Sequence, residues 1–119
     1  MKWLINRFRY AFSGIRYGLF EDRSIRFQFI LGTLAVIAGI VLQIPKNDWL
    51  WIILSICLVI TCEIFNSCIE KIVDFICPHR DPRAGLIKDM AAAAVLSASV
   101  FAFCAACFIY IPPFAALFS

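Results

Sequence analysis

The chain has 119 residues, of which 63% are hydrophobic and 16% are charged, with a formal net charge of +3. A typical soluble domain carries about 25% charged residues. The composition therefore excludes an ordinary soluble fold and predicts an all-α integral membrane protein. The length suits one domain, residues 1–119.

The first 26 residues are basic and aromatic, with six Lys and Arg residues against Glu21 and Asp22. In a helix, the aromatic and isoleucine side chains can share one surface while the arginines reach outward. This pattern predicts an amphipathic helix in the lipid headgroup region, although a plain positive-inside anchor fits the composition equally well. A signal peptide is not expected, because the first apolar run begins only at Phe27 and is too long for one.

Three apolar segments follow, at residues 27–44, 49–76 and 90–118. Each suits a membrane-spanning helix of about 20 residues, and none shows the alternation of β-barrel strands. Lys and Arg are concentrated in the N-terminal segment and in the connection from Cys77 to Asp89, whereas the first turn is neutral. By the positive-inside rule, the N-terminus and the second connection are expected in the cytoplasm.

The six cysteines lie inside these segments or at their ends. Cysteine commonly serves in such helices as a small apolar side chain. Cys104 and Cys107 match a CxxC pattern, but no second pair and no histidine stand near them in the sequence. Neither metal nor redox chemistry is expected from the cysteines, and the small residues of the third segment predict close helix packing.

The second segment carries a polar stripe, which we define as Glu63, Asn66, Glu70 and Asp74. On an α-helix these positions fall within an arc of about 80°. A carboxylate at membrane depth costs on the order of 2.5 kcal/mol or more, and is by default a functional-site hypothesis. Structural salt bridging would need more cations than Lys71 alone supplies.

Depth along the helix separates the expected roles. Glu63 lies deepest, where burial disfavours the charged form, and this suits a general base. Glu70 and Asp74 lie nearer water, where carboxylate oxygens suit Mg²⁺, and Asp22 could add a carboxylate to the same layer. The connecting loop is expected to supply His79, Arg80, Lys88 and Asp89, of which the lysine and the arginine could hold an anionic phosphate group.

This layout fits phosphoryl transfer to a hydroxyl in the membrane. The sequence has neither GxxxxGK[ST] nor GxGxxG, so P-loop and protein-kinase chemistry are not supported. Three segments instead resemble signatures of the prokaryotic diacylglycerol kinase family: the run from Glu63 to Asp74 resembles ExxNxxIExxVD, the run from Lys88 to Val95 resembles KDxxxxAV, and the run from Tyr10 to Ile15 looks like YAxxGI.

The resemblance covers nearly the whole chain and implies a small membrane lipid kinase. It implies an amphipathic surface helix, three membrane helices, and a homotrimer with active sites at subunit boundaries. The expected location is the bacterial cytoplasmic (inner) membrane, with lipid and ATP as substrates, Mg²⁺ as cofactor and no nucleic-acid partner. The implied roles are Glu63 as proton acceptor, Asp22 and Glu70 as metal ligands, Asn66 and Asp74 as supporting residues, and Tyr10, Asp22, Glu70, His79, Arg80, Asp81, Lys88 and Asp89 as ATP contacts.

Two questions stay open at this level. The family usually has a glutamate at the position of Asp22, so the shorter Asp22 or the adjacent Glu21 is the second metal ligand; Asp22 is favoured. The lipid acceptor is diacylglycerol, giving phosphatidic acid, or undecaprenol, giving undecaprenyl phosphate; diacylglycerol is placed slightly ahead. A small proton-coupled transporter and a non-catalytic assembly subunit are the alternatives from other classes.

Overall fold

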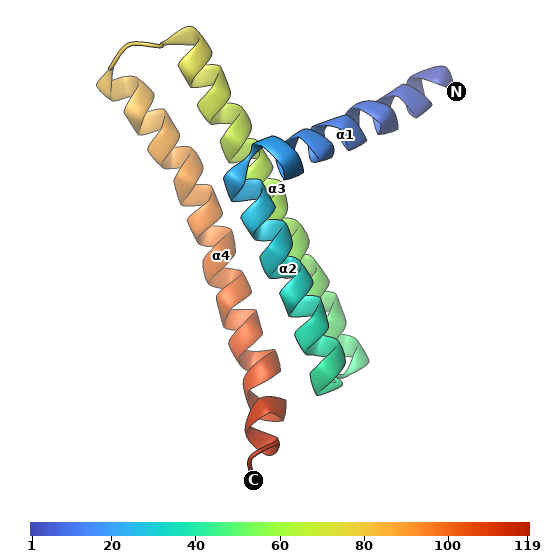
Figure 1. Cartoon of the computed structure of the whole chain (residues 1–119). Helices are drawn as coiled ribbons and strands as arrows, with labels where there is room; N and C mark the ends of the chain where they lie inside the picture. Colours follow the sequence, from blue (N-terminus) through green and yellow to red (C-terminus); the bar gives the residue numbers. More distant parts are fainter.

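The computed structural model describes all of residues 1–119 as four helices joined by short turns (Figure 1). They are α1 (Lys2–Glu21), α2 (Arg23–Leu42), α3 (Lys46–Ile76) and α4 (Pro82–Ala116). Helices α3 and α4 lie side by side as an antiparallel pair, α2 packs against α3, and α1 projects away from the bundle. The prediction of an all-helical chain with three helices long and apolar enough to cross a membrane is confirmed.

Asp22 makes the break between α1 and α2 by capping the second helix. Neither Pro nor Gly occurs at this junction. Asp22 has an extended backbone (φ −112°, ψ 114°). Its Oδ1 accepts hydrogen bonds from the backbone N–H groups of Ser24 and Ile25, at 3.0 and 3.1 Å. Aspartate is among the best N-cap residues because it satisfies N–H groups that have no partner in the helix. A new helix therefore starts here in a new direction.

Each long helix begins before the apolar segment that predicted it. The difference is largest for α4, which starts at Pro82 rather than near residue 90. Asp81 caps this helix, and Pro82 fits its first position because the N–H that proline lacks would have had no partner there. Lys88 and Asp89 consequently lie inside α4, and the prediction that they belong to the connecting loop is wrong.

The single chain forms a thin layer of helices that buries few of its own side chains. Its extents are 57 × 43 × 21 Å, and the smallest is about two helix diameters. Only 14 of the 119 residues are buried. A small core of Ile44, Ile52 and Ile109 lies near the α2–α3 turn, where the Tyr110 hydroxyl donates to the Ala35 carbonyl at 2.6 Å.

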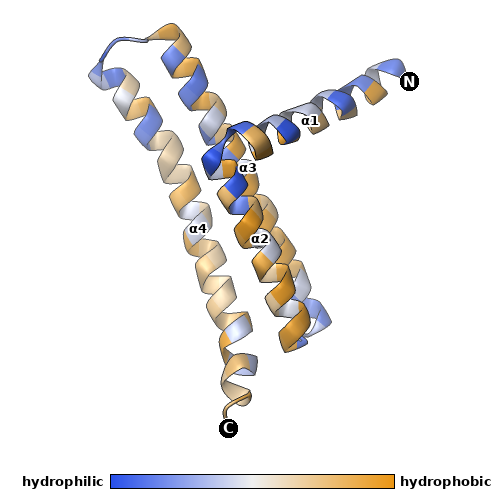
Figure 2. Ribbon diagram, viewed as in Figure 1, coloured by the Kyte–Doolittle hydropathy of each residue, from blue (hydrophilic) through white to orange (hydrophobic).

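Most apolar side chains therefore face outward. Figure 2 shows them along α2, α3 and α4, whereas hydrophilic residues gather on α1 and at the two connections. This distribution is the inverse of a soluble protein's and is typical of helices that contact lipid or other helices.

Two glycines let α2 approach α3 closely. A Cβ at Gly32 would lie 3.0 Å from Cγ2 of Ile56, and one at Gly39 would lie 2.7 Å from Cη2 of Trp49. Small residues permit such contact between membrane helices. The close packing fixes α2 along α3, and so fixes the position of Asp22 relative to the polar stripe.

Candidate active site

Glu63 is the only charged residue that the fold buries. Its side chain is 5% exposed, and the other buried polar residues are Ser55 and Ser67. All three lie on α3. Burial of an unpaired carboxylate is costly, so the fold gains nothing in stability from placing one here.

The N-terminal end of α2 meets the polar stripe at Glu63. The Ser24 hydroxyl faces the Glu63 carboxylate, and the charges of Asp22 and Glu70 lie close enough to act on it. Three carboxylates from two helices thus share one region. Like charges held together in this way usually require a cation or a proton to compensate them.

Asp22 is held as an anion at this junction. Partial burial opposes its charge, but hydrogen bonds from the Ser67 side chain and from the backbone of Ile25 and Ser24 outweigh that effect, helped by the Lys71 charge. Together they hold the pKa of Asp22 below its usual range. The carboxylate that caps α2 is therefore ionised at neutral pH.

Asn66 contributes an oxygen that has no partner. Its Nδ2 donates to Oε1 of Glu70 at 3.3 Å, which leaves its carbonyl oxygen pointing elsewhere. That Oδ1 atom is buried and accepts no hydrogen bond. A buried acceptor left unsatisfied costs about 1–3 kcal/mol, so this oxygen favours binding a donor or a cation.

The C-terminal end of the stripe is tied to α4. Lys88 Nζ forms an ion pair with Oδ1 of Asp74 at 2.5 Å, and both side chains are solvent-accessible. Because Lys88 is helical, its position is fixed by the α3–α4 packing rather than by a loop. A cation is thereby placed about one helical turn beyond Glu70.

Other predicted site residues are not brought to the stripe within one chain. Tyr10 is 70% exposed on α1, which projects away (Figure 1). Glu21, His79, Arg80 and Asp89 are exposed and make no side-chain hydrogen bond or ion pair with the stripe. Asp81 instead pairs with Arg83, whose Nη2 lies 2.8 Å from its Oδ2. The Arg83 side chain and backbone N–H lower the pKa of Asp81.

Sequence reasoning missed Ser24 and the capping role of Asp22. The available signal was Asp-x-Ser directly before an apolar run, which is a helix-start pattern. It was hidden by the two adjacent acidic residues, Glu21 and Asp22, which were both read as candidate metal ligands.

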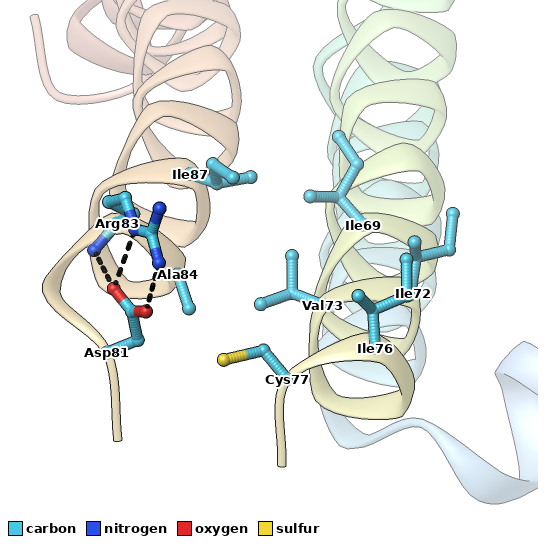
Figure 3. Close-up of a pocket in the computed structure, with 9 residues that line it drawn as sticks. All are labelled: Ile69, Ile72, Val73, Ile76, Cys77, Asp81, Arg83, Ala84 and Ile87. Carbon is cyan, nitrogen blue, oxygen red and sulfur yellow. Dashed lines mark hydrogen bonds and ion pairs between the residues drawn. The ribbon is translucent and has the colours of Figure 1, made fainter. Parts of the chain in front are cut away.

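An apolar groove of about 470 Å³ lies between α3 and α4 near their connection (Figure 3). Ile69 and Ile87 face each other across it, and the sulfur of Cys77 points into the space between the helices. Asp81 turns away toward Arg83. The lining is mostly aliphatic, so this groove carries no acid–base chemistry and is separate from the carboxylates around Glu63.

A family model described as prokaryotic diacylglycerol kinase matches residues 9–110. The match covers α2, α3 with its polar stripe, and most of α1 and α4. The chain belongs to the prokaryotic diacylglycerol kinase family, and is thus an enzyme of the lipid phosphotransferase class.

Individual relatives agree with this assignment. A diacylglycerol kinase of Synechocystis is 30% identical over 96% of this chain and 66% of its own length. A diacylglycerol kinase of Escherichia coli is 33% identical over 78% of this chain and 76% of its own length. An undecaprenol kinase of Bacillus subtilis is 29% identical over 91% of both chains. The chain thus spans about two thirds of the Synechocystis relative and more of the other two.

Proposed function

We propose that residues 1–119 form one membrane lipid-kinase domain that uses ATP and Mg²⁺ to phosphorylate diacylglycerol, giving phosphatidic acid. The observation that carries this proposal is the buried Glu63 beside Asp22 and Glu70 on an otherwise apolar helix. Kinase chemistry needs a base for the hydroxyl and oxygen ligands for a metal–phosphate group. This cluster supplies both within a membrane-embedded helix.

Position along α3 supports the division of roles. At 1.5 Å per residue, Glu63 lies about 21 Å from Trp49, Glu70 about 31 Å and Asp74 about 38 Å. A hydrocarbon core is about 30 Å thick. If Trp49 marks one interface, Glu63 lies within the lipid layer, Glu70 at the opposite interface and Asp74 in water.

Glu63 accepts the proton of the lipid hydroxyl as its oxygen attacks the γ-phosphorus in line, and ADP leaves with the bridging oxygen. The Ser24 hydroxyl orients the Glu63 carboxylate. A positioned general base typically contributes about 10²–10⁴ in rate. The lipid need not leave the bilayer, because Glu63 lies within the lipid layer.

The oxygen set fits magnesium. Asp22 and Glu70 would hold the ion, and the unpartnered Oδ1 of Asn66 is suited to complete its shell directly or through water; these are the hard ligands that Mg²⁺ prefers. When bound, the ion supplies charge compensation for the β- and γ-phosphates. Asp74 supports the site by holding Lys88 in place.

We further propose that ATP approaches from the cytoplasm and contacts Lys88 and Asp89 on α4. Lys88 supplies the positive charge that a phosphate requires. The remaining ATP contacts proposed are Tyr10, Asp22, Glu70, His79, Arg80 and Asp81.

A homotrimer accounts for the residues that one chain leaves apart. Tyr10 is remote from the stripe of its own chain, and only 14 residues are buried in the monomer. Sites at subunit boundaries would let α1 of one subunit complete the site of the next. The proposed location is the bacterial cytoplasmic membrane, with α1 on its inner surface and the N-terminus cytoplasmic; Trp3 and the arginines of α1 suit that interface.

Undecaprenol is the second candidate acceptor, giving undecaprenyl phosphate. It is favoured by the near end-to-end match with the undecaprenol kinase of Bacillus subtilis. Both lipids present a hydroxyl at the interface, so the carboxylates serve either one. A proton-coupled transporter would also need a buried carboxylate, but it would not need Lys88 next to the oxygen ligands.

The test is lipid phosphorylation by the purified protein in lipid nanodiscs. Labelled ATP and Mg²⁺ are supplied with diacylglycerol or undecaprenol in parallel. Label in phosphatidic acid at the higher rate supports the proposal, and label chiefly in undecaprenyl phosphate supports the second candidate. If neither lipid is labelled by protein that is folded and trimeric, the kinase proposal is wrong.

A further inference from the structure

The five-residue connection between α3 and α4 brings three metal-ligating side chains together. Cys77, His79 and Asp81 alternate along it, the chain bends at His79, and Asp81 has an extended backbone (φ −144°, ψ 128°). One ligand atom from each of the three lies within 4.8 Å of the others.

The closest pair has the spacing of ligands on one tetrahedral ion. Cys77 Sγ lies 3.5 Å from Nε2 of His79. Zinc–sulfur and zinc–nitrogen bonds of about 2.3 and 2.0–2.1 Å, set at a tetrahedral angle, place the two atoms about 3.5 Å apart. A thiol–imidazole hydrogen bond explains this pair equally well, but it does not explain why the Asp81 carboxylate lies within reach of both.

The third ligand is already oriented. The backbone N–H of Arg83 donates to Oδ1 of Asp81 at 2.8 Å, as an N-cap bond, and the Arg83 guanidinium donates to both carboxylate oxygens. Ligating carboxylates are typically held by such outer hydrogen bonds. The backbone bond alone fixes the carboxylate, whereas the guanidinium adds a positive charge that opposes binding of a cation.

We propose that Cys77, His79 and Asp81 form a binding site for one thiophilic divalent cation of the zinc class, with a fourth position open to water. Thiolate and imidazole select zinc over magnesium, which prefers oxygen ligands. The site is therefore distinct in chemistry from the carboxylates around Glu63. A bound ion would join the end of α3 to the start of α4. Cys77 would then be a metal ligand, whereas the other cysteines serve as apolar side chains.

Metal binding is measured on the full-length protein in detergent micelles, after removal of any histidine tag and stripping of metals. Co²⁺ is titrated first, because a cobalt–thiolate bond gives a charge-transfer absorption band in the near ultraviolet. We expect saturation at one equivalent per chain and loss of the band when Zn²⁺ displaces Co²⁺. A wild-type protein without the band would overturn the proposal.

Variants identify the ligands. Cys77→Ser should remove the band and His79→Ala should abolish one-equivalent binding, whereas the matched Cys104→Ser/Cys107→Ser variant should keep both. Retention of the band by Cys77→Ser, or its loss from the double variant, contradicts the assignment. Helical content and elution volume establish that each variant is folded.

Arg83→Gln provides a variant that gains affinity. It keeps the backbone bond that orients Asp81 and removes the competing charge, so Zn²⁺ affinity should rise by a few-fold. Unchanged or weaker binding would exclude Asp81 as a ligand. These readouts do not depend on kinase activity, so they test metal binding separately from the ATP contacts proposed above for His79 and Asp81.

Discussion

Asp22 both caps α2 and carries one of the carboxylates near Glu63, and two substitutions separate these roles. Asparagine caps helices about as well as aspartate, so Asp22→Asn keeps the acceptor for Ser24 and Ile25 and removes the charge. Asp22→Ala removes both. Loss of a cap costs about 1 kcal/mol, within a range of roughly 0.5–2, and loss of an anion at a helix N-terminus costs about 0.3–1 kcal/mol.

We therefore expect Asp22→Asn to lower the free energy of unfolding by less than about 1 kcal/mol, and Asp22→Ala to lower it by about 1 kcal/mol more. Both variants should lose magnesium-dependent phosphorylation. The loss should exceed the roughly 10–100-fold cost of removing an outer hydrogen bond around a metal. Unfolding is followed by circular dichroism as sodium dodecyl sulfate is added to mixed micelles, and activity by the lipid-labelling assay.

Glu21→Gln is the matched control, because Glu21 is exposed and makes no side-chain hydrogen bond or ion pair. It should leave stability within about 0.5 kcal/mol and activity near the wild-type level. If Glu21→Gln abolished phosphorylation while Asp22→Asn retained it, the assignment of Asp22 as metal ligand would be refuted.

The pH dependence of stability gives the same residue a second signature. The pKa of Asp22 is lower in the folded chain than in the unfolded one, so its carboxylate stabilises the fold above the unfolded value, near pH 4. That contribution is lost as the pH falls through the folded pKa. The slope of unfolding free energy against pH below about pH 4 should be smaller in Asp22→Asn, and an unchanged slope would contradict the hydrogen bonding described for this carboxylate.

Three further substitutions test the packing and the ion pair. Gly39→Ala forces a Cβ to within 2.7 Å of Trp49 and should lower the free energy of unfolding by about 1–3 kcal/mol. Gly14→Ala meets nothing within 4 Å and should raise it by up to about 1 kcal/mol. Equal effects would show that α2 does not approach α3 this closely. Tyr110→Phe removes a hydrogen bond to an α2 carbonyl and should cost about 0.5–1.5 kcal/mol in the detergent unfolding assay; a neutral result argues against that contact. Lys88→Met removes the cation paired with α3 and should raise the KM for ATP more than the KM for lipid, and the opposite pattern would place Lys88 at the lipid.

The helices and the polar stripe could be predicted from sequence because long uncharged runs and a fixed helical period define them locally. The junction at Asp22 was harder to predict, since a cap depends on whether the backbone leaves the helix at one residue. The same limitation misplaced Lys88 and Asp89: the charges of residues 80–89 suggest a loop, but Asp81 and Pro82 start a helix that carries those charges.

The partners of the stripe could not be read from the sequence in the same way. The hydrogen bond of Ser24 to Glu63, and the nearness of the Asp22 charge, depend on how closely α2 packs on α3, which Gly32 and Gly39 permit. The position of Tyr10 depends on the direction of α1 after the break, which no local sequence pattern defines. Local patterns therefore identified the candidate site residues better than they identified which residues lie next to them in the folded chain.

In the proposed reaction, the buried Glu63 accepts the proton from the lipid hydroxyl. The most direct test of this role is the initial rate of lipid phosphorylation by Glu63→Gln, which keeps the size of the side chain and removes its basicity. We expect a fall of about 10²–10⁴ in kcat, with ATP binding and assembly unchanged. Near wild-type turnover by correctly assembled Glu63→Gln protein, with either diacylglycerol or undecaprenol, would contradict this role.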